Sequence, residues 1–309
     1  MDILKTLQSL NACHGPSGDE AEVASLLEKL AMPFVDECRR DTMGNLIAHK
    51  KGAGSRVLFA AHMDSIGFIA TYIEKEGFVR FCKVGGLHAP DLIATPVRFK
   101  NGVRGVICLN EGVEPKEMTL EDLYIDIGAH DEEEARAMVG IGDTAVYDTP
   151  TFGAGDRLVS PYMDNRISCI VLLMAMEQFQ KSENDLYFVF TVQEELGLRG
   201  AKTAAYAIDP DYGIAVDVTV SADELGSKHS GSSRLGGGAA IKVMDSSIIC
   251  HPEMVSKLSA LAGERGIDVQ MDVIRSGGTD AGSIYTTKMG VLTGGISCLL
   301  YTSDAADEL

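Results

Sequence analysis

The sequence predicts an α/β protein with a mixed, mainly parallel sheet and helices on both of its faces. Three nearly continuous apolar runs, at Arg56–Ala61, Leu186–Val192 and Gly213–Val218, are typical of strands that are buried on both sides. Apolar residues at helical spacing lie between these runs, and strands that alternate with helices favour parallel pairing. The length of 309 residues suits one large domain or two ordinary ones.

Three helices are expected around these strands. Ser17 and Glu20 have the S-x-x-E spacing of a capping box, which predicts that the first helix begins there. A second helix is expected directly after Asp164, which we interpret as its N-cap. Pro252 and Gly266 mark the start and end of a third helix, and the alternation that follows predicts another strand. The apolar positions behind these predictions are Val23, Leu26, Leu27 and Leu30; Ile167, Ile170, Val171 and Met174; and Ile267, Val269, Met271 and Val273.

Residues 67–155 have a different pattern from the rest of the chain. They contain short β segments separated by glycines, with one acidic helix expected at Asp131–Val139. This composition predicts a small β-barrel inserted into the α/β domain. The chain is therefore divided into a discontinuous domain of residues 1–66 and 156–297 and an inserted domain of residues 67–155.

The charge of the chain excludes some partners. There are 27 Lys and Arg against 45 Asp and Glu, a formal charge of −18, which disfavours both nucleic acid and anionic membranes as partners. The first residues lack the pattern of a secretory signal, and Ile170–Met176 is too short an apolar run to cross a bilayer. The seven cysteines are scattered without a C-x-x-C pair, which favours a reducing, cytoplasmic location.

Acidic and imidazole side chains follow the predicted strands and precede the helix between them. Taken singly, they have simpler explanations as a satisfied polar histidine, a solvated glutamate pair and a helix cap. The carboxyl ends of parallel strands, however, meet at one edge of a sheet, where open α/β sheets bind ligands. We therefore expect these side chains to form one site. They are His62, Asp64, Asp164, Glu194, Glu195 and Asp217.

A pair of divalent cations is the simplest counter-charge for this site. Unpaired buried charge is costly, and no cluster of Lys or Arg accompanies these residues in the sequence. Mixed histidine and carboxylate ligands suit zinc, cobalt or manganese, whereas calcium prefers oxygen alone. Two such cations, about 3.5–4 Å apart, can share a bridging carboxylate and activate a water for hydrolysis.

Hydrolysis at two metals suggests roles for these side chains. Asp164, at the edge of the sheet, is placed to bridge the ions. Of Glu194 and Glu195, one can bind a metal while the other exchanges the proton of the water, since consecutive residues point in different directions. Asp64 follows His62 by two residues and can hold the second imidazole nitrogen.

Five segments in order resemble the tetrahedral aminopeptidase family, which includes glutamyl aminopeptidases. They are AAHMDSIGF, SPYMDNR, TVQEELGLRGA, AVDVT and SGGTDAG, and the resemblance extends from Leu4 to Ile296. Family members are cytoplasmic dinuclear metallopeptidases, some of which carry an old cellulase label. The resemblance implies a metal-dependent aminopeptidase that hydrolyses N-terminal residues from short peptides, with residues 1–66 and 156–297 as its catalytic domain.

The resemblance also implies a set of metal ligands for two ions, zinc or cobalt. His62 and Asp217 would bind one ion and Glu195 the other, with Asp164 bridging them. The inserted domain of residues 67–155 would mediate dimerisation, and the dimers would assemble into a hollow dodecamer.

Two further roles are implied by the same resemblance. Glu194 would be the general acid/base, and Asp64 would orient the imidazole of the metal-binding histidine. Gly278, Thr279 and Asp280 match a family motif near the site. Substrate contact explains this motif as well as a glycine turn followed by an aspartate helix cap does.

The end of the sequence departs from the family pattern. Family members continue past the strand at 290–297 with a segment that holds a last metal-binding histidine, whereas no histidine follows Ser297 here. One back-translation of the following residues resembles a transposon-end sequencing adapter, so we interpret residues 298–309 as an artefactual tail. The chain as written is then expected to lack one ligand beside Glu195, which would leave that ion weakly bound.

Two other functions stay open at this point. A carboxypeptidase or deacylase would need a positive group for the substrate carboxylate, for which Arg166, Arg199 and Arg275 are candidates. A non-catalytic shell subunit or an inactive fragment would follow from the missing ligand and would hold no metal tightly. A glycosidase is disfavoured, since glycosidases use two spaced carboxylates and no metal cage.

Overall fold

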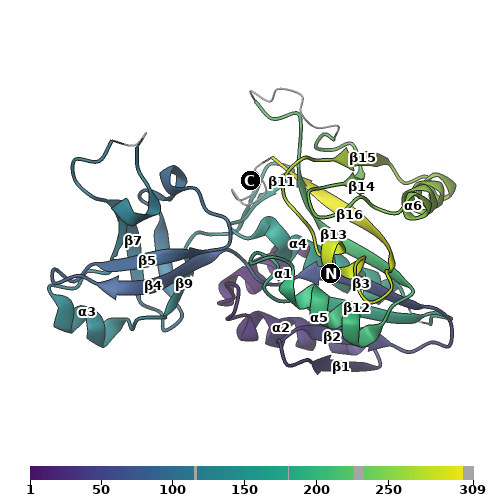
Figure 1. Cartoon of the computed structure of the whole chain (residues 1–309), viewed down its shortest axis with the longest axis horizontal. Helices are drawn as coiled ribbons and strands as arrows, with labels where there is room; N and C mark the ends of the chain where they lie inside the picture. Colours follow the sequence, from purple (N-terminus) through teal and green to yellow (C-terminus); the bar gives the residue numbers. More distant parts are fainter. Residues whose placement is uncertain (115–116, 180, 226–232, 302–309) are drawn as a thin grey trace.

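The chain forms an α/β domain and a closed six-stranded barrel, which lie side by side in Figure 1. The structure is a computed structural model that describes residues 1–114, 117–179, 181–225 and 233–301. The architecture confirms the predicted α/β class with an inserted small barrel. Within the described residues, none of the helices has the length and apolar character that a membrane span requires.

The α/β domain is built on one eight-stranded sheet of order β1-β2-β12-β3-β13-β16-β14-β15. The pairings β12–β3, β3–β13, β13–β16 and β14–β15 are parallel, whereas β1–β2, β2–β12 and β16–β14 are antiparallel, so the sheet is mixed. The strands are β1 (Glu37–Arg40), β2 (Leu46–Lys50), β3 (Arg56–His62), β12 (Asp185–Thr191), β13 (Tyr212–Val220), β14 (Ala239–Met244), β15 (Val269–Val273) and β16 (Leu292–Leu300).

Helices cover both faces of this sheet because its central strands are apolar on both sides. Three helices pack on one face, two on the other, and one against β14 and β16. The first group is α1 (Ile3–Ala12), α2 (Ala21–Ala31) and α4 (Met163–Gln178); the second is α5 (Arg199–Ile208) and α7 (Ala281–Ile284); the last is α6 (Pro252–Arg265). Leu10, Leu27, Leu173 and Phe188 are fully buried in the core between the first group and the sheet.

The barrel closes in the order β4-β5-β8-β7-β6-β9. Phe68 is buried at its centre and makes edge-to-face contacts with Phe81 and Tyr147, at ring-centroid distances of 5.2 and 5.4 Å. The elements are β4 (Gly67–Ile73), β5 (Val79–Val84), β6 (Pro96–Phe99), β7 (Arg104–Leu109), β8 (Leu123–Asp126), α3 (Glu132–Met138) and β9 (Thr144–Tyr147). A hairpin of β10 (Phe152–Ala154) and β11 (Arg157–Val159) leads back to α4, and the 3-10 helices are η1 (Met32–Phe34), η2 (Ala89–Leu92) and η3 (Leu120–Asp122).

The segment between α1 and α2 contacts the barrel through polar side chains. The carboxylate of Asp19 accepts hydrogen bonds from Lys100 Nζ at 2.5 Å and from Thr144 Oγ1 at 3.1 Å. The ring of the buried His14 lies with Nε2 2.7 Å from Thr144 Oγ1. These contacts attach the barrel to the part of the α/β domain that carries the site described below.

The expected start of the first helix is wrong in two respects. An additional helix, α1, precedes it and is capped by Asp2, whose side chain accepts from the amide of Lys5. The capping box does not form: α2 begins at Ala21, Glu20 makes no side-chain cap, and the Ser17 hydroxyl donates to Asp64. The physical reason is that both side chains bond to more distant segments.

Two further expectations at element ends need correction. Asp164 and Asn165 have non-helical φ and ψ angles, so the regular part of α4 begins just after them, near the expected start, but the Asp164 carboxylate does not cap it and faces His62 instead of a backbone amide. Asp217 does not end its strand, because β13 continues to Val220 alongside β16. Of the segment interpreted as an artefactual tail, residues 298–300 belong to β16 and residues 302–309 lie outside the described residues.

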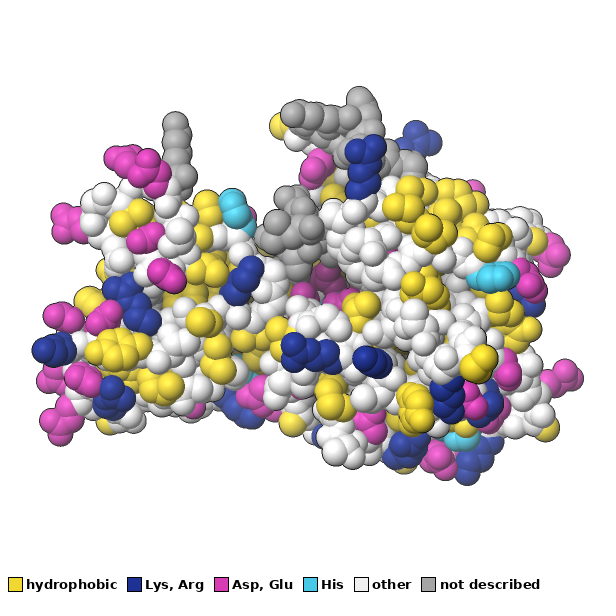
Figure 2. Space-filling model, in the orientation of Figure 1, with side chains coloured by type: hydrophobic (Ala, Val, Ile, Leu, Met, Phe, Trp, Pro, Cys, Tyr) yellow, Lys and Arg dark blue, Asp and Glu magenta, His cyan; other side chains and the backbone are white. Residues whose placement is uncertain are grey.

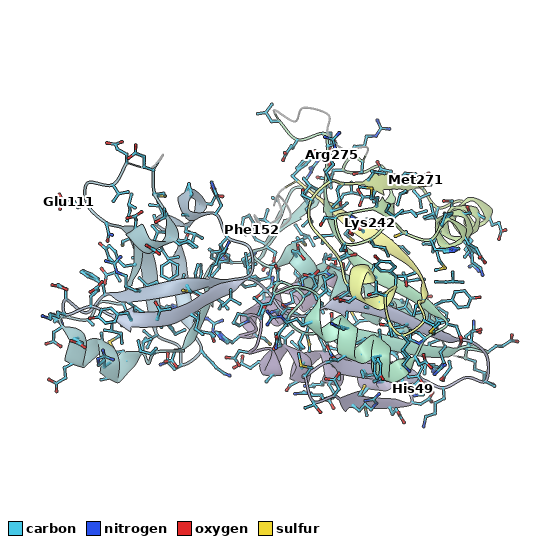
Figure 3. All side chains as sticks on the ribbon, viewed as in Figure 1. His49, Glu111, Phe152, Lys242, Met271 and Arg275 are labelled. Carbon is cyan, nitrogen blue, oxygen red and sulfur yellow. The ribbon has the colours of Figure 1, made fainter. Side chains whose placement is uncertain are left out.

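A buried ion pair joins the last two strands of the sheet. Lys242 on β14 and Asp272 on β15 are opposite in register, 2.5 Å apart between Nζ and Oδ2, and each side chain is 1% exposed. Figure 3 shows Lys242 inside the sheet domain. Gly295 makes room for it, since a Cβ there would lie 2.9 Å from the Cβ of Lys242.

Removal of one partner of this pair should be strongly destabilising. Lys242→Met leaves the Asp272 carboxylate buried without its cation, which typically costs about 3–5 kcal/mol of unfolding free energy. The double variant Lys242→Met/Asp272→Leu should recover most of that loss, because no buried charge is left. Urea denaturation of the two single variants and the double variant measures this coupling, and additive losses would contradict it.

Candidate metal centre

Three neighbouring strands bring the predicted side chains to the same edge of the sheet. His62 ends β3 and is in register with Thr191, the last residue of β12, so Glu194 and Glu195 follow just beyond the same edge. Ala60 is in register with Ala215 on β13, and His62 and Asp217 are each two residues further along. The alternation of a strand places these two side chains on one face at one level.

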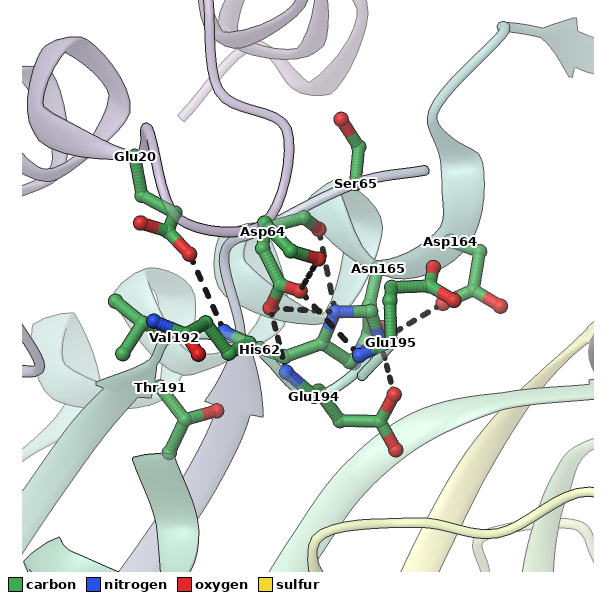
Figure 4. A network of polar contacts seen from close by, with 12 residues as sticks. Glu20, His62, Asp64, Ser65, Asp164, Asn165, Thr191, Val192, Glu194 and Glu195 are labelled. Carbon is green, nitrogen blue, oxygen red and sulfur yellow. Dashed lines mark hydrogen bonds and ion pairs between the residues drawn. The ribbon is translucent and has the colours of Figure 1, made fainter. Parts of the chain in front are cut away.

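The imidazole of His62 lies at the centre of a group of carboxylates (Figure 4). Its Nε2 atom is 3.0 Å from Asp164 Oδ1, 3.6 Å from Asp217 Oδ1 and 3.9 Å from Glu194 Oε2. Glu195 joins the same group, since His62, Asp164 and Glu195 each offer a ligand atom within 4.8 Å of the others. The structure thus brings together all four residues that were expected to bind metal.

Asp64 lies beneath this group and is fully buried. The Nδ1 atom of His62 is 3.2 Å from the backbone carbonyl of Asp64 and 3.5 Å from its carboxylate, so the carbonyl is the nearer partner. The carboxylate accepts hydrogen bonds from the amides of Glu194 and Glu195, at 3.1 and 3.3 Å, and from the Ser17 hydroxyl at 2.6 Å. Asp64 therefore contacts both the imidazole and the turn that carries the two glutamates.

The segment 278–280 divides into two environments. Gly278 lines the cavity of the site, whereas Thr279 and Asp280 are buried behind it. Asp280 holds the expected N-cap position of α7, but its carboxylate makes no bond to an amide of that helix and accepts from Thr191 Oγ1 at 2.5 Å instead. Thr279 Oγ1 donates to Asp245 at 3.2 Å.

The cavity at this site has a volume of about 250 Å³, and acidic side chains are visible in the hollow between the two domains in Figure 2. It is lined by His62, Asp164, Glu194, Glu195, Gly197, Leu198, Asp217, Val218, Ser246, Gly277 and Gly278. None of these described lining residues is a lysine or an arginine.

The three arginines considered for a substrate carboxylate lie elsewhere. Arg166 is fully buried, and its guanidinium donates to the backbone carbonyls of Leu10 and Gly15, at 2.8 and 3.2 Å. Arg199 and Arg275 are exposed and do not line the cavity; Figure 3 labels Arg275. The carboxypeptidase alternative therefore has no cationic anchor among the described lining residues.

The pKa values of the side chains in this group are shifted by burial and by the charges of their neighbours. Burial raises the pKa of Glu194, and the charges of Asp217 and Asp280 raise it further against the opposing effect of His62. Burial also raises the pKa of Asp217, and that of Asp280 to about 7. Burial alone would lower the pKa of His62, but the surrounding carboxylates outweigh it and hold this pKa well above its usual range.

The donor set of the site fits divalent metal ions. A buried imidazole surrounded by carboxylates is the ligand chemistry of zinc and of related transition metals. A bound cation of charge +2 would compensate the mutual repulsion of these carboxylates. The cavity leaves the carboxylates of Asp164, Glu194, Glu195 and Asp217 accessible to such ions.

Sequence analysis missed two residues that support the site. Glu20 was assigned to a capping box, yet it is 6% exposed and accepts from the amides of Gly18 and Gln193. Burial raises its pKa to about 7. Thr191, which contacts Asp280, was not considered. The contacts Glu20–Gln193 and Thr191–Asp280 join segments that are far apart in the chain, so the local sequence around these residues could not identify them.

The likeness to known proteins decides the family. Residues 44–307 match the family described as M42 glutamyl aminopeptidase. The chain belongs to the M42 glutamyl aminopeptidase family. A protein of Acetivibrio thermocellus is 46% identical over 297 residues, which are 96% of this chain and 90% of that protein.

Solved structures agree with this assignment. An aminopeptidase of the archaeon Desulfurococcus kamchatkensis is 36% identical, with a TM-score of 0.92 over 99% of this chain and 91% of the other. The TET1 peptidase of Pyrococcus horikoshii, which can assemble into a tetrahedron or a large octahedral shell, is 30% identical, with a TM-score of 0.87 over 99% and 93%. As an M42 aminopeptidase, the chain is a metal-dependent hydrolase that acts on peptide bonds, which confirms the resemblance and the enzyme class expected from the sequence.

Asp64→Ala should weaken metal binding at this M42 site without removing a direct ligand. The substitution deletes the carboxylate that contacts the His62 imidazole and the amides of Glu194 and Glu195, and loss of such a supporting group typically costs about 10–100-fold in metal affinity. Calorimetric titration with zinc measures the change. Asp126→Ala in the barrel is the control, and equal affinities in the two variants would contradict this role.

Proposed function

We propose that this M42 protein hydrolyses N-terminal residues from short peptides with two divalent ions, zinc or cobalt, and a glutamate as general acid/base. The observation that carries the proposal is the cluster of carboxylates within 4 Å of His62 Nε2. When bound, the ions would polarise the scissile carbonyl and lower the pKa of a water molecule.

The proposed ligands follow the resemblance to the family. His62 and Asp217 would hold one ion, and Glu195 the other, without the histidine that the family pattern adds after Ser297. Asp164 would serve both, which is supported by its position near His62 Nε2 and within the same ligand group as Glu195. Asp64 orients His62 from the opposite side of the ring, by its carbonyl and carboxylate together.

Glu194 is proposed as the proton carrier. Its carboxylate lines the cavity but lies farther from His62 Nε2 than the carboxylates of Asp164 and Asp217 do, and burial raises its pKa. A group that exchanges protons during hydrolysis needs such a position beside the reacting water. Glu194 takes the proton of the attacking water and transfers it to the leaving amine.

The lining of the cavity supports cleavage at the N-terminus of the substrate. None of the described lining residues is a lysine or an arginine that could receive the C-terminal carboxylate of a peptide. Gly278 would contact the substrate, which is supported by its position in the cavity lining, and the buried Thr279 and Asp280 would support it from behind.

The assembly is proposed by likeness. We propose that the chain forms homo-oligomers, with the inserted domain of residues 67–155 mediating dimerisation and the dimers forming a dodecamer. The shells formed by the Pyrococcus horikoshii peptidase support this proposal.

Blocked peptides test the direction of cleavage. A short peptide with a free amine and an amidated C-terminus should be hydrolysed, whereas its N-acetylated counterpart should not, because acetylation removes the positive charge.

Chelation with EDTA should abolish hydrolysis and zinc or cobalt should restore it. Preferred hydrolysis of the N-acetylated peptide with a free carboxylate would contradict the proposal.

Glu194→Gln should retain metal and lose turnover. The amide keeps the size of the side chain but cannot carry the proton, and general acid–base help is typically worth about 10²–10⁴ in kcat. Metal content by mass spectrometry and kcat at saturating metal are the measurements. If the substitution instead empties a metal position, the roles of Glu194 and Glu195 are reversed.

A further inference from the structure

Side chains from three separate segments bind the amides of four consecutive residues where β12 meets the site. The amide of Val192 donates to Asn45 Oδ1 at 3.0 Å, and the amide of Gln193 donates to Glu20 Oε1 at 3.2 Å. The next two amides, of Glu194 and Glu195, donate to the Asp64 carboxylate. The amides of this stretch are thus bound by side chains, whereas the carbonyls of Val192 and Gln193 accept from the backbone amides of Gly200 and Arg199, at 3.0 and 3.2 Å.

Gln193 has a backbone conformation that needs such support. Its φ angle is +53°, in the left-handed region that non-glycine residues seldom adopt. Glu20 binds the peptide plane before Gln193 and Asp64 binds the plane after it, as Figure 4 shows for the Glu20 contact. Fixing both planes fixes the φ and ψ angles of Gln193, and these angles set the direction in which the Glu194 side chain leaves the backbone.

We propose that Glu20 is a positioning residue for the reaction, which fixes the backbone at Gln193 and thereby aims the carboxylate of Glu194 into the cavity. This inference rests on the proposed role of Glu194. Glu20 is not among the described residues that line the cavity, and its side chain accepts from the backbone amides of Gly18 and Gln193, so it would act on the site through the backbone.

The placement of Glu20 supports this role over that of a helix cap. Its side chain stands at the N-cap position of α2 but makes no bond to the helix, and reaches instead to Gly18 at 2.7 Å and to Gln193. Burial of a carboxylate is costly unless its hydrogen bonds repay it. The bond to Gln193 spans 173 residues of sequence, which makes it a tertiary contact between the start of α2 and the site.

The first experiment measures hydrogen exchange of the metal-free protein. Glu20→Met keeps the approximate size of the side chain but removes the acceptor, so the amides of residues 193–195 should exchange at least about tenfold faster, as expected for a local opening. Glu22→Met is the matched control: Glu22 lies on the same helix and accepts from the amide of His14, not from this turn. Glu20→Asp, which keeps the charge but shortens the reach, should act as Glu20→Met does and serves if that variant does not fold.

The second experiment measures turnover with zinc or cobalt. Misplacement of a reacting group by about 1 Å can cost 10²-fold in rate, so Glu20→Met should lower kcat by about 10–100-fold. The KM should change by no more than about threefold, because the residues that line the cavity are retained. The metal content per subunit should not change, because the proposed ligands are retained. Glu20→Gln keeps an acceptor oxygen and should restore both slow exchange and kcat.

Three outcomes would overturn the inference. The first is exchange of residues 193–195 in Glu20→Met that is no faster than in Glu22→Met, the second is a Glu20→Gln variant as defective as Glu20→Met, and the third is a normal kcat in Glu20→Met. Failure of the proposed function is recognised separately. Full activity of Glu194→Gln would remove the role of Glu194, whereas loss of activity there with normal kcat in Glu20→Met would reject only the role of Glu20.

Discussion

The structure depends on keeping several carboxylates together around one buried imidazole. Burial raises the pKa values of Glu194 and Asp217, and repulsion from the neighbouring carboxylates raises them further. These carboxylates lie at the edge of a sheet whose central strands are fixed by parallel pairing and by apolar layers on both faces. A rigid sheet can hold groups that would separate if the backbone were free to relax.

Buried polar side chains behind the site hold its residues in position through hydrogen bonds. Asp64 contacts the imidazole on one side and two amides on the other, and Ser17 in turn donates to Asp64. Arg166 lies fully buried nearby and donates to the carbonyl of Gly15, which also accepts from the amide of Ser65 at 3.1 Å. Hydrogen bonds thus join the loop before α2 to the end of β3, so that neither segment shifts alone.

The fold class and the grouping of the site residues could be predicted because both follow from local patterns. Apolar runs such as Arg56–Ala61 identify buried strands, and polar residues that follow parallel strands must meet at one edge. The ends of elements could not be predicted equally well, because Asp164, Ser17 and Glu20 have typical capping chemistry but bond to His62, Asp64 and Gln193 instead.

Tertiary contacts decide whether a potential capping side chain bonds to the helix or to a distant segment, and the short-range spacing of residues carries no information about these contacts. The same holds for the pairing of Lys242 with Asp272, which depends on the register of β14 and β15 and on the space that Gly295 leaves.

The loop between α1 and α2 belongs to both parts of the molecule at once. Asp19 is bonded to Lys100 and Thr144 of the barrel, while Ser17 is bonded to Asp64 beneath the site. A rotation of the barrel must therefore break the bonds of Asp19 or pull on the residues next to it. The loop therefore connects the barrel to the carboxylate beneath the metal-binding group through side chains that are only two residues apart.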